Sequence, residues 1–283
     1  MKIRKAYVAN AFYAGNRTSL TNQINDCFTH KFGPRQVPKV AKPGPRRILG
    51  VVSPHAGYMY SGPVAANGFA KLAADGTPET FVILGPNHTG YGSGVSILTE
   101  GAWETPLGTS QIQSELAKRI QKASTILDID EASHAHEHSI EVQLPFIQFL
   151  YGDSVKFIPI CMMMQDLQTC REIAKDIVEQ CKGTNYAIIA SSDFTHYEPH
   201  ETACKKDKMA IDAILKMDDD TLNLLGESNR VTMCGYGPIT TLIAAAKLIT
   251  GVNVELLTHK TSGDITEDRS AVVGYSSLVF SRA

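Results

Sequence analysis

The chain has 283 residues, of which 43% are hydrophobic, with a formal net charge of -2 at pH 7 and 6 cysteines. A chain of this length buries about three quarters of its unfolded surface, so it needs neither disulfides nor a structural metal to form a core. The apolar fraction excludes a disordered chain, and the balanced charge excludes nucleic acid as an expected partner. We also expect no membrane span, no secretion signal and free thiols, and therefore a cytoplasmic protein.

Hydrophobic patterns predict strands that alternate with helices along the chain, after a proline-rich approach at 36–47. The predicted strands are residues 48–53, 80–84, 155–161, 186–190, 254–258 and 272–280. The predicted helices are residues 20–28, 63–74, 110–123, 138–150, 167–180, 202–216 and 239–249. This alternation predicts a single α/β domain over residues 1–283, with a mainly parallel, mixed central sheet flanked by helices on both faces. The last two strands have no helix between them and are expected to pair antiparallel.

Three of these strands, the first, second and fourth, lead directly into His55, His88 and His196. Ligands of open α/β sheets bind outside the carboxyl ends of the strands, which makes these histidines candidate site residues. For any one of them, a hydrogen-bonded loop histidine is the alternative interpretation. Asp193, three residues before His196, either orients that imidazole or caps a turn.

Cys234 lies in a glycine-rich turn just before the predicted helix at 239–249. The free amides and the dipole at a helix N-terminus favour a thiolate at such a position. Two imidazoles and one thiolate are a recognised catalytic ligand set for zinc, and sulfur also suits Cu(I). A nucleophilic Cys–His pair and a small buried hydrophobe are the alternatives.

A histidine-rich segment precedes the core of the helix predicted at 138–150. His134, His136 and His138 are two residues apart, which suits either metal chelation or a polar rim. Glu137 and Glu141 share a helix face if the helix begins that early. We expect one of these glutamates, or His138, to reach the site.

The remaining charged and sulfur-containing clusters are interpreted as surface or core. The basic cluster at 205–208 and the acidic cluster at 218–220 have opposite signs and are expected on the solvated surface. The methionines at 162–164 are expected to fill the core, as are Cys161, Cys170 and Cys181, which lie in apolar patterns.

Five motifs in the order SPHAGY, LGPNH, EHSIEVQLPF, SSDFTHY and MCGYGP resemble those of the Memo family, the protein B type of the AmmeMemoRadiSam system. The resemblance extends from AFYAGN, at 11–16, to the last predicted strand. The family resembles the class III extradiol dioxygenases of the LigB type in fold. The resemblance implies a metal held by His55, His88 and Cys234. It also implies a catalytic base at His196, with Asp193 next to it, and radical-SAM proteins as partners.

The chain departs from the dioxygenase pattern at one metal ligand. The dioxygenases hold Fe(II) with two histidines and a carboxylate, whereas Cys234 stands here in place of the carboxylate. Sulfur shifts the preference toward Zn or Cu(I), so the expected cofactor is one ion of Fe(II), Zn or Cu.

The leading hypothesis is a metal-dependent oxidoreductase that binds a small molecule or peptide in its cleft. The alternatives are a peptide- or protein-binding module without turnover and a metal-dependent hydrolase. The sequence does not predict the oligomeric state.

Overall fold

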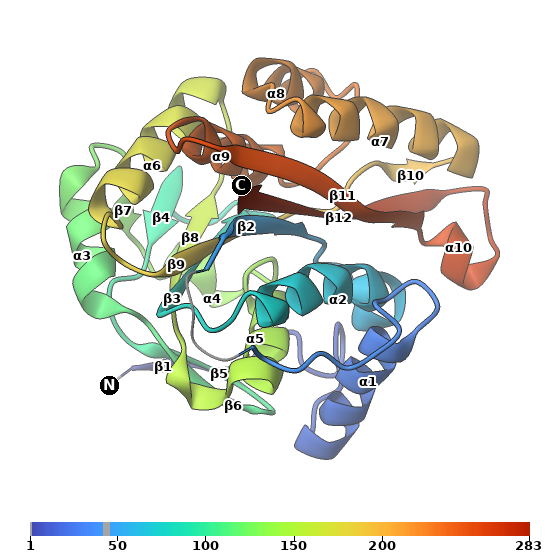
Figure 1. The fold of residues 1–283 in the computed structure, drawn as a ribbon, viewed down its shortest axis with the longest axis horizontal. Coiled ribbons are helices and arrows are strands. Elements are labelled where there is room, and N and C mark those ends of the chain that lie inside the picture. The colour runs from blue at the N-terminus through green and yellow to red at the C-terminus, as the bar shows by residue number, and fades with distance from the viewer. Residues whose placement is uncertain (1, 42–45) are drawn as a thin grey trace.

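A computed structural model describes residues 2–41 and 46–283 and contains a large mixed sheet between layers of helices (Figure 1). Residues 42–45, part of the predicted proline-rich approach, lie outside the described residues. The strands are β1 (Ile3–Arg4), β2 (Ile48–Ser53), β3 (Thr80–Pro86), β4 (Val95–Ile97), β5 (Ala102–Thr105), β6 (Gly108–Gln111), β7 (Asp128–Ile129), β8 (Lys156–Met162), β9 (Tyr186–Ser191), β10 (His196–Glu198), β11 (Val252–Thr261) and β12 (Val272–Arg282).

The helices account for most of the chain between these strands. The α-helices are α1 (Arg17–Thr29), α2 (Tyr58–Ala74), α3 (Ser114–Ala123), α4 (Ala132–Ala135), α5 (Leu144–Tyr151), α6 (Leu167–Gln180), α7 (His200–Leu215), α8 (Asp219–Glu227), α9 (Tyr236–Lys247) and α10 (Gly263–Thr266). Short 3-10 helices lie at Glu141–Gln143 and Gly152–Ser154. No helix among the described residues combines the length and the apolar character needed to cross a bilayer.

The main sheet has the strand order β10-β12-β2-β9-β3-β8-β4-β7, with β11 paired to β12. The inner strands β2, β9, β3 and β8 run parallel to one another. Strand β12 joins β2 antiparallel and pairs antiparallel with β11. The predicted mixed α/β sheet and its antiparallel pair are confirmed. Because β2, β9 and β3 are adjacent and parallel, their carboxyl ends lie side by side at one edge.

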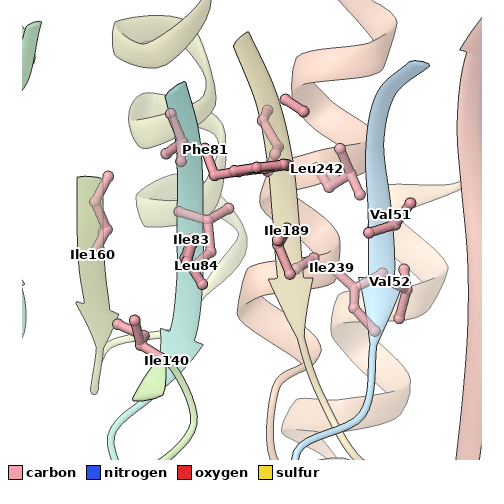
Figure 2. Close-up of a cluster of buried hydrophobic side chains, with 14 of the residues drawn as sticks. Val51, Val52, Phe81, Ile83, Leu84, Ile140, Ile160, Ile189, Ile239 and Leu242 are labelled. Atoms are coloured by element: carbon pink, nitrogen blue, oxygen red, sulfur yellow. The ribbon is translucent and has the colours of Figure 1, made fainter. Parts of the chain in front are cut away.

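Helices cover both faces of the inner strands (Figure 1). Helix α2, with α1 and α5 packed against it, covers one face, while α9 with α6 and α8 covers the other. Figure 2 shows Ile239 and Leu242 of α9 against the inner strands, near Ile189 of β9. A strand buried on both faces needs apolar residues on both, which explains the continuous apolar runs seen in the sequence.

A small second sheet, in the order β1-β5-β6, was not predicted. Strand β6 includes Ser110 and Gln111, which the sequence pattern assigned to a helix at 110–123, and α3 begins only at Ser114. Strands of two to four residues are too short to show a periodic pattern. The amphipathic pattern of α3 therefore predicts a helix that begins too early and includes the end of β6.

Helix α2 begins at Tyr58, five residues before the predicted start, and Pro63 lies inside it. The early start is fixed by Tyr58, which is buried and donates a hydrogen bond of 2.7 Å to the carbonyl oxygen of Val142. Pro63 lacks the N–H that the carbonyl oxygen of Met59 would accept in a regular helix.

The acidic cluster at 218–220 is not simply solvated surface. Asp219 is buried, accepts a hydrogen bond of 2.8 Å from Nε of Arg171, and also pairs with Lys247. Asp218 caps α8 by accepting from the backbone N–H of Thr221. The prediction of a solvated cluster is therefore wrong for Asp219, because the first turn of α8 packs between two basic side chains.

The cysteine and methionine predictions are confirmed in part. All six cysteines are free thiols, and Cys161, Cys170 and Cys181 are buried as expected. Met162 is buried, but Met163 and Met164 are exposed, because they follow the last residue of β8 and leave the sheet.

A buried ion pair fastens the N-terminal segment to the domain. Glu141 is fully buried and accepts hydrogen bonds from Arg4 at 2.6 Å, from Tyr13 Oη at 2.6 Å, and from the backbone N–H groups of Tyr7 and Val8. One carboxylate thus satisfies four donors from a segment that lies more than 120 residues away in the chain. The segment 4–13 is therefore held against the part of the chain that leads into α5.

Replacing Glu141 by Gln should lower the free energy of unfolding by about 3 kcal/mol, because it leaves the Arg4 charge without its buried partner. Urea denaturation measures this loss. The matched control is Glu104→Gln, which removes the exposed Lys5–Glu104 pair of the same segment and should cost less than about 1 kcal/mol. Equal losses in the two variants would contradict the role assigned to Glu141.

Candidate metal centre

His55, His88 and Cys234 converge at the carboxyl ends of the adjacent strands. Their ligand atoms all lie within 4.8 Å of one another. His55 follows β2 and His88 follows β3, while Cys234 precedes α9, which packs across these strands and β9. Sγ of Cys234 is 3.1 Å from Nε2 of His55. The structure thus brings together the three residues that the sequence indicated as metal ligands.

The ring of His55 is fixed in one tautomer by Ser191, the last residue of β9. The Ser191 hydroxyl donates its only hydrogen to the carbonyl oxygen of Ser139 at 2.7 Å. Its oxygen also accepts from Nε2 of Gln143 at 2.8 Å, so it can only accept from Nδ1 of His55, at 2.8 Å. Burial lowers the pKa of His55 well below its ordinary value, with smaller contributions from the charges of His88 and His138. His55 is therefore neutral, and its lone pair lies on Nε2.

Glu137 orients His88 in the same way. Its carboxylate accepts from Nδ1 of His88 at 2.9 Å and also from the His88 backbone N–H. Burial opposes ionisation, but the hydrogen bond and charge of His88, with smaller contributions from His138 and Ser139, outweigh it and lower the pKa of Glu137 to about 2. An ionised carboxylate can only accept, so Nδ1 of His88 carries the hydrogen. The lone pair of His88 then lies on Nε2, as in a carboxylate–histidine–metal arrangement.

His196 lies at the start of β10 with its ring held by the backbone. Nδ1 is 2.8 Å from the carbonyl oxygen of Thr232, which can only accept, so Nε2 carries the lone pair here too. The backbone N–H of His196 donates to the Thr232 hydroxyl at 2.8 Å. His196 is close enough to His55 to affect its pKa. Its Nδ1 is thus engaged by the backbone, and Nε2 is the ring nitrogen left for a ligand.

Asp193 supports the loop of His55 rather than the ring of His196. Its Oδ1 accepts from the backbone N–H of His55 at 2.9 Å, and burial raises the pKa of its carboxyl to about 6. Among the described residues, the ring of His196 donates to the carbonyl oxygen of Thr232 and not to Asp193. The charge of His196 lowers the pKa of Asp193 and so opposes part of the effect of burial.

The protein alone does not favour a thiolate at Cys234. Burial raises the pKa of the thiol, and the nearby Asp193 carboxylate adds to the shift. Burial thus opposes the thiolate that was expected here from a helix N-terminus, and α9 begins only at Tyr236, two residues after Cys234. The backbone N–H of Asp193 donates to Sγ at 3.3 Å, which supports negative charge on the sulfur. A bound cation would deprotonate the thiol outright.

Part of the histidine-rich segment lies at the site, and the rest lies away from it. His138 reaches the site, where its ring stacks on His88 with centroids 4.6 Å apart and lies 5.4 Å from the ring of His55. His134 is buried against Ser96, and His136 contacts Tyr7. The expectation that one member of this segment reaches the site is confirmed for Glu137 and His138.

The predicted helix at 138–150 is regular only from Leu144. Residues 138 and 139 turn their backbone N–H groups onto the carboxylate of Glu137, both at 2.8 Å. Glu137 and Glu141 therefore do not share a helix face. Their carboxylates serve His88 and Arg4 respectively.

A second group of candidate ligands consists of His88, Glu137 and His138. It shares His88 with the first group, but the Glu137 carboxylate is already engaged by four N–H groups of His88, His138 and Ser139. Those contacts suit a carboxylate that positions a ligand better than one that binds the metal itself.

Exposed apolar side chains accompany the site motifs, a feature that sequence reasoning missed. Tyr197 is 78% exposed, Tyr91 67%, Met59 64% and Met164 51%. Tyr197 follows His196 directly and has a φ of 57°, which is uncommon for a residue with a side chain. A strained backbone at such a place is a feature of ligand sites.

Comparisons with known proteins agree on one family. A family model described as Memo-like protein matches residues 4–279. A MEMO1 family protein of Methanopyrus kandleri is 48% identical over 281 residues, covering 99% of each chain. One of Methanothermobacter thermautotrophicus is 47% identical, covering 98% of this chain and 99% of the relative. Among solved structures, an uncharacterized protein of Escherichia coli K12 has the same fold, with a TM-score of 0.56 at 12% identity, covering 82% of this chain and all of the other.

The stability of the protein should depend on pH through His134. Burial lowers the pKa of His134 to about 3, from 6.5 in an unfolded chain. Between these values the unfolded state binds a proton that the folded state does not, so the stabilisation is present above pH 6.5 and is lost as the pH falls toward 3. The difference in unfolding free energy between wild type and His134→Gln should shrink by at most about 1.4 kcal/mol per pH unit in this window. A difference that is constant with pH would contradict the buried, neutral state of His134.

Proposed function

The chain belongs to the Memo-like protein family, and from this premise we propose that it is a metal-dependent oxidoreductase with one ion held by His55, His88 and Cys234. The observation that carries the proposal is the directionality of the hydrogen bonds. The acceptors at Nδ1 of His55 and His88 leave the Nε2 lone pairs uncommitted to them, and ligand atoms of His55, His88 and Cys234 lie within 4.8 Å of one another. Three donor atoms with free lone pairs at this spacing are what a cation requires.

The donor set fits an ion of intermediate or soft character. Two imidazole nitrogens and one sulfur suit Zn or Cu(I), and Fe(II) is the third ion expected from the dioxygenase-like architecture. When bound, the ion supplies a Lewis-acid or redox centre with coordination positions left for a substrate. The competing use of Cys234 and His55 as a nucleophilic pair is disfavoured, because burial raises the pKa of the thiol and lowers that of the imidazole.

The chain's own groups bind, orient and accept a proton. Ser191 and Glu137 hold the two imidazoles in the ligand tautomer, and the backbone N–H of Asp193 donates to Sγ of Cys234. His196 is the general base, accepting a proton at Nε2 from a hydroxyl group of the substrate. Its Nδ1 is occupied by the hydrogen bond to Thr232, which leaves Nε2 to accept the proton.

A second candidate function, binding a peptide without turnover, is favoured by the exposed apolar side chains beside the site motifs, Met59, Tyr91, Met164 and Tyr197. Exposed tyrosine and methionine are enriched in binding surfaces. If this were the function, Tyr197→Ser would abolish binding of a peptide from a random-sequence library, whereas His55→Ala would leave its affinity unchanged.

The proposed compartment is the cytoplasm, because all six cysteines are unpaired. Radical-SAM proteins as partners stay a prediction. A metal-dependent hydrolase remains the third candidate and predicts turnover without O₂.

Titration of metal-free protein with Co²⁺ should produce a thiolate-to-cobalt charge-transfer band in the near ultraviolet at one ion per chain. The band should vanish in Cys234→Ser and in His55→Ala, which lack a ligand. Cys204→Ser is the matched control, since Cys204 is also a partly buried thiol with a histidine nearby, and it should retain the band. A band that survives in the Cys234→Ser, His55→Ala double variant would refute the ligand assignment.

His196→Gln should retain the metal but lower catalysis by about 100-fold or more, the usual contribution of a general base. Oxygen uptake in the presence of a panel of catechols measures the activity, and the cobalt band reports that the site is intact. Turnover of an ester or amide panel without oxygen uptake would instead favour the hydrolase. Full oxygen uptake in His196→Gln would remove His196 from the mechanism.

A further inference from the structure

A cavity of about 350 Å³ lies beside the small sheet, between β1, β5 and the segment 131–136. Its volume is in the range of pockets that enclose small organic molecules. The lining includes the apolar side chains Leu98, Ala102, Trp103 and Ile112. None of the three metal-ligand candidates lines it.

Planar groups dominate the cavity. The Arg4 guanidinium lies over the ring of Trp103, 4.1 Å from its centroid, and the rings of Tyr7 and His136 are 4.7 Å apart. Tyr7 is 55% exposed, so an aromatic face remains open to a ligand. Flat, apolar walls favour a flat, apolar ligand, because ring stacking adds to the burial of area.

The charged residues that line the cavity already have partners of opposite sign. Lys2 pairs with Glu131, and Arg4 pairs with Glu141. Lys5 pairs with Glu104, and Glu100 pairs with Lys118. No charge among these lining residues is left to neutralise an ionic ligand, which favours an uncharged one.

Two buried polar atoms of the lining residues lack a hydrogen-bond partner among the described residues. They are Nε1 of Trp103 and Nδ1 of His134. Unsatisfied buried donors are uncommon, and the indole N–H can only donate. Both atoms are shielded from solvent, so they lie within the wall of the cavity and impose no polar requirement on a ligand.

The cavity is separated from the metal centre by the segment that carries Glu137. On the cavity side, Arg4 donates to the carbonyl oxygens of His134 at 2.7 Å and Glu137 at 2.8 Å. The carboxylate of Glu137 points the other way, to His88. The cavity is thus not part of the candidate metal centre.

We propose that this cavity is a binding site for a small, uncharged aromatic molecule. The proposal does not depend on metal binding or on turnover at the metal centre.

The test uses the neutral fluorescent probe N-phenyl-1-naphthylamine. Trp103 is the only tryptophan of the chain, so energy transfer from tryptophan to the probe has a single donor, which lines this cavity. We expect saturable transfer at one probe per chain. Transfer that is absent or does not saturate would overturn the proposal.

Three displacing compounds of similar shape separate the features of the ligand. Quinoline carries a ring nitrogen, naphthalene carries none, and 2-naphthoate carries a charge. Quinoline and naphthalene, which are both uncharged, should displace the probe with similar affinity. 2-Naphthoate should be the weakest of the three. Equal or tighter binding of 2-naphthoate would overturn the assignment of an uncharged ligand.

A variant places the site. Ala135 is exposed and lines the cavity, and Ala135→Phe should fill part of it and weaken probe binding at least tenfold. Ala74→Phe, at an exposed alanine at the end of α2, is the matched control and should bind as the wild type does. Thermal unfolding establishes that each variant is folded. If Ala135→Phe is folded and binds the probe as the wild type does, the proposed location is wrong. If that variant does not fold, the relative affinities of the three displacing compounds test the proposal.

Discussion

The hydroxyl group of Ser191 has a single hydrogen, and the arrangement of the candidate metal centre depends on where that hydrogen goes. It is donated to the carbonyl oxygen of Ser139, so the oxygen can only accept from Gln143 and His55. The direction of one hydrogen bond thus sets which nitrogen of His55 faces Cys234. Ser191 ends β9, which lies between β2 and β3 in the sheet, and its register partner is Ser53 at the end of β2. The sheet determines where the donor atoms lie, and the hydrogen-bond directions determine which of them can bind a cation.

The sequence predicted the inner strands of the main sheet because these depend on local patterns, and the ligand candidates that it indicated lie together in the fold. Continuous apolar runs identified β2 and β9, and a histidine soon after a strand end is visible without knowing the fold. The supporting groups could not be found this way. Thr232 acts through a backbone carbonyl, which any residue would provide, and Ser191 looks like an ordinary strand end. The raised pKa of Cys234 was also out of reach, since it depends on burial in the assembled fold.

The segment from His134 to Glu141 shows how local patterns fail when tertiary contacts override them. Its spacing suggested one helix face, but Glu137 folds the next backbone N–H groups onto its own carboxylate, and the regular helix starts only at Leu144. Successive side chains then serve different purposes. Glu137 and His138 contact His88, while His134 faces the cavity beside Trp103 and Glu141 fastens the N-terminal segment. Eight residues thus connect the centre, the cavity and the N-terminus.

The acceptors that fix the histidine rings differ in how they would respond to mutation. Nδ1 of His196 rests on the main-chain oxygen of Thr232, and the Ser191 hydrogen rests on the main-chain oxygen of Ser139. Any residue type supplies these oxygens, so genetic drift at positions 139 and 232 preserves the acceptors as long as the backbone keeps its course. The acceptors at Ser191 and Glu137 are side-chain atoms and have no such protection. Within this site, the hydrogen bond that fixes Nδ1 of His196 survives substitution of Thr232. The hydrogen bonds that fix Nδ1 of His55 and His88 can each be lost by a single codon change.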